Sequence, residues 1–203
     1  MRNNNNLIEH LVNSDALHSS NIIEAFKNID RKDFVFDPTI QDIYEDYPLQ
    51  IGYRQTISQP TTVAMMMEML SPRKGQKILD IGSGSGWTTA LLSFIVGDRG
   101  SVTGVERVEE LVRFGSTNLK KYRFKNAKII QAEEKLGISG EKFDRILVSA
   151  AADEFPAELG EQLKPGGKLV IPVRNSIYEI RKTQSGELEA VEHYGFTFVP
   201  LIF

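Results

Sequence analysis

The chain has 203 residues and a formal net charge of −3, a length that fits one domain with a sizeable core and a charge that gives no electrostatic reason to expect a nucleic-acid partner. It contains no cysteine, which excludes disulfides, thiolate metal sites and a cysteine nucleophile, and we expect no bound metal. No apolar run approaches the roughly 18 residues of a membrane span, and residues 1–6 lack the apolar core of a signal peptide, so we expect a cytoplasmic protein that does not enter a membrane.

The first 46 residues predict a helical segment. Apolar side chains recur at helical spacing over residues 7–12 and again over residues 22–29, and residues 19–21 offer polar caps for the second helix. The asparagine tract at residues 3–6 predicts a frayed tail. We interpret the apolar stripes as core.

Residues 47–60 have no clean period and are rich in hydroxyl, amide and glycine groups, directly before a predicted helix over residues 61–70. Polar groups crowded at a helix N-terminus can cap the helix. They can equally present hydroxyl and N–H groups to an anion. Both interpretations stay open from these residues alone.

Residues 78–86, Ile-Leu-Asp-Ile-Gly-Ser-Gly-Ser-Gly, predict a strand buried on both faces that runs into a glycine turn. Residues 87–96 follow with helical spacing, and strand, glycine turn and helix together open a doubly wound nucleotide fold. Dinucleotide sites have the spacing G-x-G-x-x-G, whereas here the third glycine comes one residue early and Trp87 stands next. This spacing disfavours a nicotinamide oxidoreductase. An ordinary glycine-rich turn is the remaining alternative.

The D-x-G-x-G-x-G arrangement that begins at Asp80 resembles the first motif of S-adenosylmethionine (SAM) methyltransferases. In that family the glycine loop lies against the methionine part and the ribose of the cofactor. The resemblance implies a cofactor site that includes Asp80, Gly82, Ser83, Gly84 and Gly86.

A second predicted strand, residues 101–106, ends in Glu106, which lies 20 residues beyond Gly86. A carboxylate at that place can accept both ribose hydroxyls of an adenosine. The alternative is an exposed glutamate at a strand end. A helix over residues 109–122 follows, and further strands are predicted at residues 127–131 and 143–149. Residues 162–173 predict the end of a helix, a turn on Gly166-Gly167 and then a fifth strand. The alternation predicts an α/β fold with a mostly parallel sheet and helices on both faces.

Several blocks together resemble the protein-L-isoaspartate O-methyltransferase family over roughly residues 20–203. They are Ile43-Tyr44-Glu45-Asp46, Pro48-Leu49, Ile51-Gly52-Tyr53, residues 55–60 (Gln-Thr-Ile-Ser-Gln-Pro), residues 143–152, residues 162–173 and residues 195–201. The resemblance implies a doubly wound, Rossmann-like SAM methyltransferase fold with a seven-stranded sheet, whose last two strands follow an unusual order. Residues 177–182 and 192–201 would supply these two strands, with an antiparallel turn at Ser185-Gly186 between them. We expect one domain over residues 1–203, made of a helical preface (1–46) and a core that binds cofactor and substrate (47–203).

The resemblance also implies an activity. Members of this family transfer a methyl group from SAM to the free carboxylate of L-isoaspartyl residues in damaged proteins or peptides, and the ester then collapses through a succinimide. Ser58 is the expected catalytic residue, with a hydrogen bond that positions the carboxylate. The other implied residues are Arg54, Gln55, Thr56, Ala150 and Ala151 on the substrate side, and Arg107 and Glu133 on the cofactor side. We expect a monomer.

A carboxylate acceptor needs no general base, because its pKa near 4 leaves it ionised at pH 7. None of the three histidines lies in a candidate motif, so the sequence favours an enzyme that holds, orients and partly desolvates the reacting oxygen.

Three positions depart from the family pattern. Ala132-Glu133-Glu134 stands where relatives often carry Gly-Asp-Gly, and Glu134 brings a charged side chain to a place where glycine lets the backbone approach adenine. Arg54 stands beside the expected acceptor site, where it can bind a substrate carboxylate or remain solvated. Arg174 replaces a usual glycine. A SAM methyltransferase with another acceptor, and a catalytically weak SAM-binding relative, therefore remain alternatives.

Overall fold

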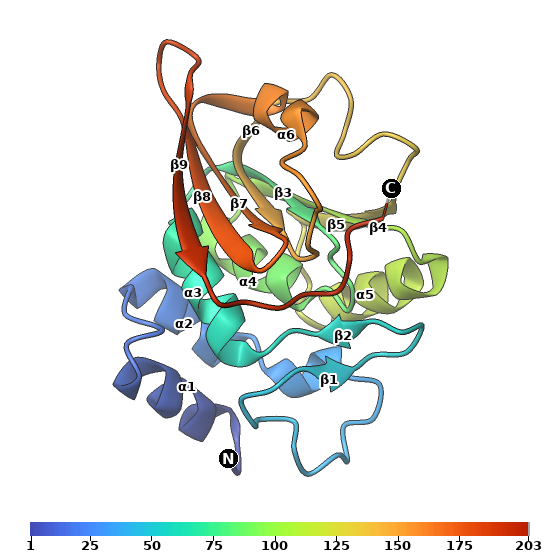
Figure 1. The fold of residues 1–203 in the computed structure, drawn as a ribbon. Helices are drawn as coiled ribbons and strands as arrows, with labels where there is room; N and C mark the ends of the chain where they lie inside the picture. Colours follow the sequence, from blue (N-terminus) through green and yellow to red (C-terminus); the bar gives the residue numbers. More distant parts are fainter. Residues whose placement is uncertain (203) are drawn as a thin grey trace.

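The computed structural model describes residues 1–202, in which a seven-stranded sheet carries helices on both faces and a two-stranded ribbon lies at one end of the sheet (Figure 1). The helices are α1 (Asn4–Asn13), α2 (Ser20–Asn28), the 3₁₀ helix η1 (Arg31–Phe34), α3 (Pro60–Leu70), α4 (Trp87–Val96), α5 (Glu109–Lys121) and α6 (Ala157–Glu161). The strands are β1 (Leu49–Gln50), β2 (Thr56–Ile57), β3 (Lys77–Ile81), β4 (Ser101–Glu106), β5 (Ala127–Gln131), β6 (Phe143–Val148), β7 (Leu163–Val173), β8 (Ser176–Lys182) and β9 (Leu188–Tyr194).

The seven strands lie in the order β5-β4-β3-β6-β7-β8-β9, and the first five of these are parallel. β8 and β9 are antiparallel to their neighbours because the connections that precede them are too short for a parallel crossover. Gly186 makes the second of these turns with a φ of +96°, as predicted. The first turn places Arg174 at a φ of +53°, a conformation that glycine adopts more easily, which explains why a glycine is the expected residue there.

Three sequence predictions of local structure are wrong. The fifth predicted strand does not begin after Gly166-Gly167, since β7 starts at Leu163 and contains both glycines. The last strand is β9, which ends at Tyr194, and not residues 192–201; Gly195 breaks the strand with a φ of +105°, and the chain then leaves the sheet. The asparagine tract is not a frayed tail, since the Asn3 side chain accepts a hydrogen bond from the Asn6 N–H at 3.0 Å and so caps α1.

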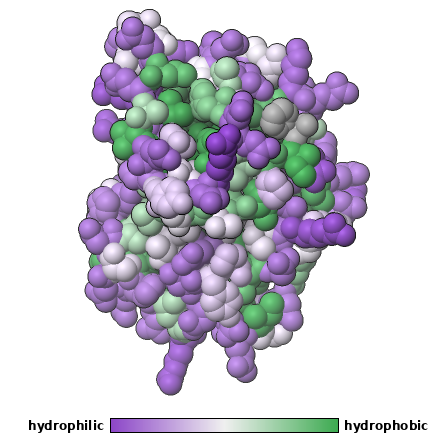
Figure 2. All heavy atoms as spheres, in the orientation of Figure 1, coloured by the Kyte–Doolittle hydropathy of each residue, from purple (hydrophilic) through white to green (hydrophobic). Residues whose placement is uncertain are grey.

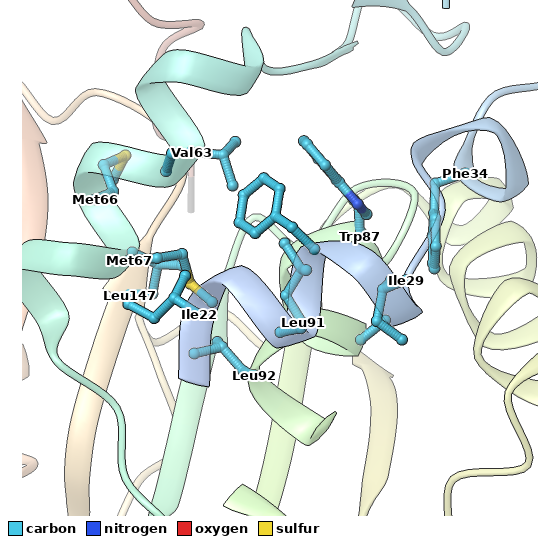
Figure 3. Close-up of a cluster of buried hydrophobic side chains, with 14 of the residues drawn as sticks. Ile22, Ile29, Phe34, Val63, Met66, Met67, Trp87, Leu91, Leu92 and Leu147 are labelled. Carbon is cyan, nitrogen blue, oxygen red and sulfur yellow. The ribbon is translucent and has the colours of Figure 1, made fainter. Parts of the chain in front are cut away.

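One face of the sheet is covered by α3, α4 and α5, with α1 and α2 packed outside them. Ile22 of α2, Met67 of α3 and Leu91 of α4 meet in one buried cluster with Leu147 of the central strand β6 (Figure 3). Trp87, the first residue of α4, is 2% exposed and belongs to the same cluster. The helical preface is therefore part of the main core.

Among the described residues, the other face carries the short helix α6, the loop of residues 132–142 and Leu201 of the C-terminal segment. Apolar residues gather on the upper part of the surface in Figure 2, over the region where Figure 1 shows β8, β9 and α6. Phe155, Tyr178, Leu188 and Tyr194 line a shallow hollow there.

No helix among residues 1–202 is long and apolar enough to cross a membrane.

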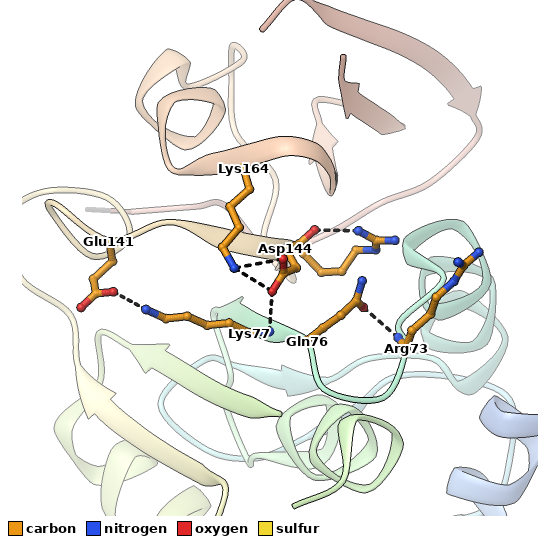
Figure 4. Close-up of polar contacts among 7 residues, drawn as sticks. Arg73, Gln76, Lys77, Glu141, Asp144 and Lys164 are labelled. Carbon is orange, nitrogen blue, oxygen red and sulfur yellow. Dashed lines mark hydrogen bonds and ion pairs between the residues drawn. The ribbon is translucent and has the colours of Figure 1, made fainter. Parts of the chain in front are cut away.

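Charged side chains gather at the amino ends of the central strands. Asp144 of β6 accepts hydrogen bonds from the Lys77 N–H at 2.7 Å and from the Lys164 ammonium at 3.0 Å, and Lys77 also pairs with Glu141 (Figure 4). Arg145 donates to the Leu70 carbonyl at 2.8 Å and so ties the C-terminus of α3 to the sheet. This end of the sheet is fixed by ion pairs, whereas the opposite end is hollow.

Candidate functional site

A cavity lies at the carboxyl ends of β3, β4 and β6, the place where open α/β sheets bind ligands. Four segments from distant parts of the chain surround it: residues 55–58, the glycine turn after β3, residues 132–137, and the C-terminal residues 199–202. Figure 1 shows how this arises, because the C-terminal segment crosses between the sheet and the β1–β2 ribbon. The shallow hollow over β8 and β9 is a separate feature: no glycine turn lines it, and it lies on the face of the sheet that carries α6.

The glycine turn spans residues 82–86, and three of these five residues have a left-handed backbone conformation. Gly82, Gly84 and Gly86 have φ values of +74°, +50° and +87°. Gly82 and Gly84 line the cavity, together with Ser83, whose buried hydroxyl makes no hydrogen bond within the described chain. Gly86 does not line it. A Cβ on Gly86 would stand 3.2 Å from the Gly115 carbonyl oxygen, so this glycine lets the turn lie against α5.

Asp80 lies beneath the turn and is fully buried. Its Oδ2 accepts hydrogen bonds from the Thr88 and Thr89 hydroxyls at 2.8 and 2.6 Å, while its Oδ1 has no partner within residues 1–202. Burial raises the pKa of Asp80 to about 6, and nearby Glu106 adds to this rise, against the effect of the two threonine hydrogen bonds. Asp80 supports the turn from below and does not line the cavity.

Glu106 is 7% exposed and lines the cavity at the end of β4. Its Oε2 accepts a hydrogen bond from the Gly84 N–H at 2.9 Å, and its Oε1 accepts one from the Val108 N–H at 2.8 Å. Each carboxylate oxygen keeps a further lone pair for a ligand hydroxyl. The carboxylate therefore fixes the glycine turn and can also bind a ribose.

The loop that follows β5 closes one side of the cavity with Glu133, Leu136 and Gly137, whereas Glu134 is exposed and outside the lining. Gln162 holds this loop: its Oε1 accepts from the Ile138 N–H at 2.8 Å and its Nε2 donates to the Leu136 carbonyl at 2.9 Å. A Cβ on Gly137 would stand 2.2 Å from that amide oxygen and would displace the Gln162 side chain, and the φ of +82° also favours glycine.

The acceptor side comes from the end of the β1–β2 ribbon. Gln55, Thr56 and Ser58 all line the cavity, directly before α3 begins. Arg54 does not line it. It occupies the tight turn of the ribbon with a φ of +60° and is exposed, because the turn points away from the sheet.

Ala150 lines the cavity, but Ala151 does not. The Ala151 N–H donates to the Val199 carbonyl at 2.8 Å, and its own carbonyl accepts from the Leu201 N–H at 2.7 Å. The main chain of Ala151 is thus occupied by the C-terminal segment and is not free for a substrate. That segment instead contributes lining residues of its own.

The cavity therefore brings together most of the predicted site residues: Gln55, Thr56, Ser58, Gly82, Ser83, Gly84, Glu106, Arg107, Glu133 and Ala150. It leaves Arg54, Asp80, Gly86 and Ala151 outside the lining. It also includes residues that were not predicted as site residues, among them Lys135, Leu136, Gly137, Ser149 and residues 199–202. The only sequence signal for the last group was the matching block at residues 195–201.

The three histidines lie elsewhere. His10 on α1 faces Asp46 at 3.5 Å, His18 faces Glu68 at 3.3 Å, and His193 is on β9. The cavity offers carboxylates, hydroxyls and main-chain N–H groups. Such groups can bind and orient a ligand, and an ionised nucleophile needs nothing more.

Comparison with known proteins gives a consistent pattern. The profile of the family described as protein-L-isoaspartate(D-aspartate) O-methyltransferase matches residues 2–202. The chain is 41% identical over 202 residues to the protein-L-isoaspartate O-methyltransferase of Methanopyrus kandleri, covering 97% of this chain and 89% of the relative. It is 40% identical over 186 residues to that of Methanothrix thermoacetophila, covering 91% of this chain and 89% of the relative.

A solved structure is also similar. It is that of a Plasmodium falciparum protein assigned as a protein-L-isoaspartate O-methyltransferase, in complex with S-adenosyl-L-homocysteine. The TM-score is 0.89 and the identity 26%, and the match covers 100% of this chain and 99% of the other.

Proposed function

The chain belongs to the protein-L-isoaspartate(D-aspartate) O-methyltransferase family, and from this premise we propose how its own residues carry out the family reaction. The protein transfers a methyl group from SAM to the free carboxylate of isoaspartyl residues, the first step of protein repair. The observation that carries the residue assignment is the common cavity: Ser58 and the glycine turn line the same space.

The cofactor half of the cavity fits SAM. When bound, SAM supplies an electrophilic methyl group on a sulfonium. The Glu106 carboxylate has lone pairs for two ribose hydroxyls, and the unpartnered Ser83 hydroxyl is a free donor and acceptor beside the turn. Glu133 is the candidate for the adenine amine, since it lines the cavity on the loop after β5.

The acceptor half positions an anion. The Ser58 hydroxyl donates a hydrogen bond to the isoaspartyl carboxylate and aims one of its oxygens at the methyl group. Thr56 and Gln55 offer further donors, and Ala150 also lines the cavity. The carboxylate is already ionised at pH 7, so these residues orient and desolvate it and move no proton.

An isoaspartyl and an aspartyl residue differ in where the carboxylate lies relative to the main chain. The first has its carboxylate on the α-carbon, and the second carries it one methylene farther away. A misplacement of about 1 Å can cost on the order of 100-fold in rate, so a cavity that fixes the carboxylate should discriminate between the two by at least that factor.

The test uses labelled SAM and two peptides that differ only in this linkage. We expect methylation of the isoaspartyl peptide and little of the aspartyl one. Ser58→Ala should lose most of its turnover while SAM binding is mostly kept, and the rate should show no inflection near pH 6.5 from a general base. Equal methylation of both peptides would contradict the assignment.

The finer setting belongs to the same proposal. We infer a cytoplasmic monomer that acts on isoaspartyl-containing proteins and peptides and does not bind nucleic acid, in keeping with a net charge of −3. Light scattering of the purified protein tests the monomeric state, and a binding assay with mixed nucleic acid tests whether the protein binds nucleic acid.

A further inference from the structure

The side chain of Arg31 is buried at 0% exposure although it carries a charge. Its three hydrogen bonds all run to main-chain carbonyls: Nε to Ile43 at 2.9 Å, Nη1 to Ser58 at 2.7 Å and Nη2 to Tyr47 at 3.2 Å. Burying a charge without a carboxylate in contact is expensive, and here the three hydrogen bonds offset part of that cost. The three bonds therefore hold the main chain of residues 43, 47 and 58 around one guanidinium.

The three carbonyls belong to chain that has almost no regular structure. Between η1 and α3 the only strands are the two-residue β1 and β2, so few backbone hydrogen bonds fix this stretch. A guanidinium has its donors in a rigid planar fork, which sets the relative positions of the groups it binds. Arg31 thus joins two turns of the irregular stretch to the carbonyl of Ser58.

Arg31 also contacts the cofactor side. Its Cζ lies 4.9 Å from the centroid of the Trp87 ring, which follows directly after the glycine turn and lines the cavity. One side chain therefore touches both the main chain of Ser58 and the residue next to Gly86. Burial lowers the pKa of Arg31 to about 9, and Asp46 raises it, so the guanidinium stays charged at neutral pH.

Asp46 holds the chain on the other side of Ser58. Its carboxylate accepts from the Thr61 N–H at 2.9 Å, the Thr61 hydroxyl at 2.7 Å and the Gln59 amide at 3.2 Å. The residue at the N-cap of α3, Gln59, makes no capping bond of its own, so Asp46 caps the helix from 15 residues away. Ser58 lies between these two anchors.

We propose that Arg31 is a positioning residue for methyl transfer: it sets the place of Ser58 relative to the glycine turn, with the Asp46 cap fixing the chain that follows. This rests on the proposed function of Ser58. Arg31 does not line the cavity, and it acts through Ser58 without touching either substrate.

The test is a double-mutant cycle between Arg31→Met and Ser58→Ala. Arg31→Met should lower kcat about 100-fold, the order expected for a displacement of about 1 Å, with the Kd of SAM changed less than about threefold. In the Ser58→Ala background the same change should lower kcat by less than about threefold, because the group it positions is gone.

Arg145→Met is the matched control. Arg145 is also buried, at 8% exposure, and donates to two carbonyls, those of Leu70 and Asp144, at the far end of α3. The Arg145→Met variant should be destabilised, as Arg31→Met is, but its kcat should stay within about threefold of the parent value. If Arg31→Met does not fold, Arg31→Lys enters the same cycle, since it keeps the charge but cannot reach three carbonyls from one nitrogen.

Additive losses in the cycle, or equal kcat losses in the Arg31 and Arg145 variants, would overturn the proposal and leave Arg31 a stabilising residue only. Hydrogen exchange tests whether Arg31 positions residues 55–61 without using any substrate, so it stays informative even if the proposed function of Ser58 is wrong. Amides of residues 55–61 should exchange at least about tenfold faster in Arg31→Met than in Arg145→Met, whatever the substrate. Equal exchange in the two variants would also overturn it.

Discussion

Asp80 makes the stability of the cofactor-free protein depend on pH in an uncommon direction. Its pKa rises from 3.8 to about 6 on folding, chiefly because of burial. Between these two values the folded protein holds a proton that the unfolded chain has lost, so stability falls as pH rises. The contribution is fully present below pH 3.8 and is lost as pH rises through about 6.

The size follows from the shift. A difference of about 2 units at about 1.4 kcal/mol per unit gives about 3 kcal/mol in all, of which about 2 kcal/mol falls between roughly pH 4 and pH 6.5. Asp144 and Asp46 have lowered pKa values, so the stability that they contribute to the folded protein is lost as pH falls. Their effect is the same in any variant at position 80, so it cancels in a difference.

Asp80→Asn is the variant to compare, because it keeps an acceptor for the Thr88 and Thr89 hydroxyls and does not titrate. Urea unfolding of both proteins without cofactor, at steps from about pH 4 to about pH 7, gives the difference in unfolding free energy at each pH. The parent should lose about 2 kcal/mol relative to the variant across this range. Parallel curves would refute the reasoning and mean that Asp80 is ionised throughout.

Four further substitutions test the cavity. Glu106→Ala removes the charge-assisted bonds to the Gly84 and Val108 N–H groups and the acceptor for ribose, so SAM affinity measured by calorimetry should fall by about 1.5–3 kcal/mol; an unchanged affinity would show that Glu106 only supports the turn. Glu134→Gly should leave SAM affinity within about twofold, because Glu134 is outside the lining, whereas Glu133→Ala should weaken it by about 0.5–1.5 kcal/mol; the reverse order would exchange the two roles. Gly115→Ala puts a Cβ 3.0 Å from the Gly84 carbonyl oxygen and should lower the unfolding free energy by about 1–3 kcal/mol and weaken SAM; a fully stable variant would mean that α5 can move away.

The sheet could be predicted from the sequence because its strands are buried and its turns are marked. The predicted strand at residues 127–131 and the predicted helix at residues 87–96 match β5 and α4, since period and glycine punctuation agree there. The prediction of the last strand failed because the apolar, β-favouring run at residues 196–201 has the composition of a strand, yet it pairs with Ala151 instead of extending β9.

The site was predictable where function depends on local chemistry. The glycine turn and Glu106 follow from short-range spacing, and both lie in the lining. Arg54 and Ala151 could not be placed this way. Whether a side chain or a main-chain group faces a cavity depends on a turn with positive φ in the first case and on a distant segment in the second.

Arg31 shows the same limit from the other side. In the sequence it is one charged residue among several, in Asp-Arg-Lys-Asp, and such a run is usually a solvated face. Its neighbour Lys32 is indeed half exposed in the Asp30 ion pair, while Arg31 is fully buried. Nothing in the local pattern separates the two, because the three carbonyls that bind Arg31 lie 12, 16 and 27 residues away.

The helical preface therefore contributes to the site and does more than cover the sheet. Phe26 of α2 packs edge-on against Trp87, with ring centroids 5.5 Å apart at 71°, while Arg31 contacts the same ring. The residue that follows the glycine turn is thus held by two residues of the preface, one of which also binds the Ser58 carbonyl. The cofactor turn and the acceptor segment are made by different parts of the chain, and Arg31 contacts both, through the Ser58 carbonyl and the Trp87 ring. A segment without any catalytic side chain therefore belongs to the catalytic unit, because it holds the two halves of the cavity together.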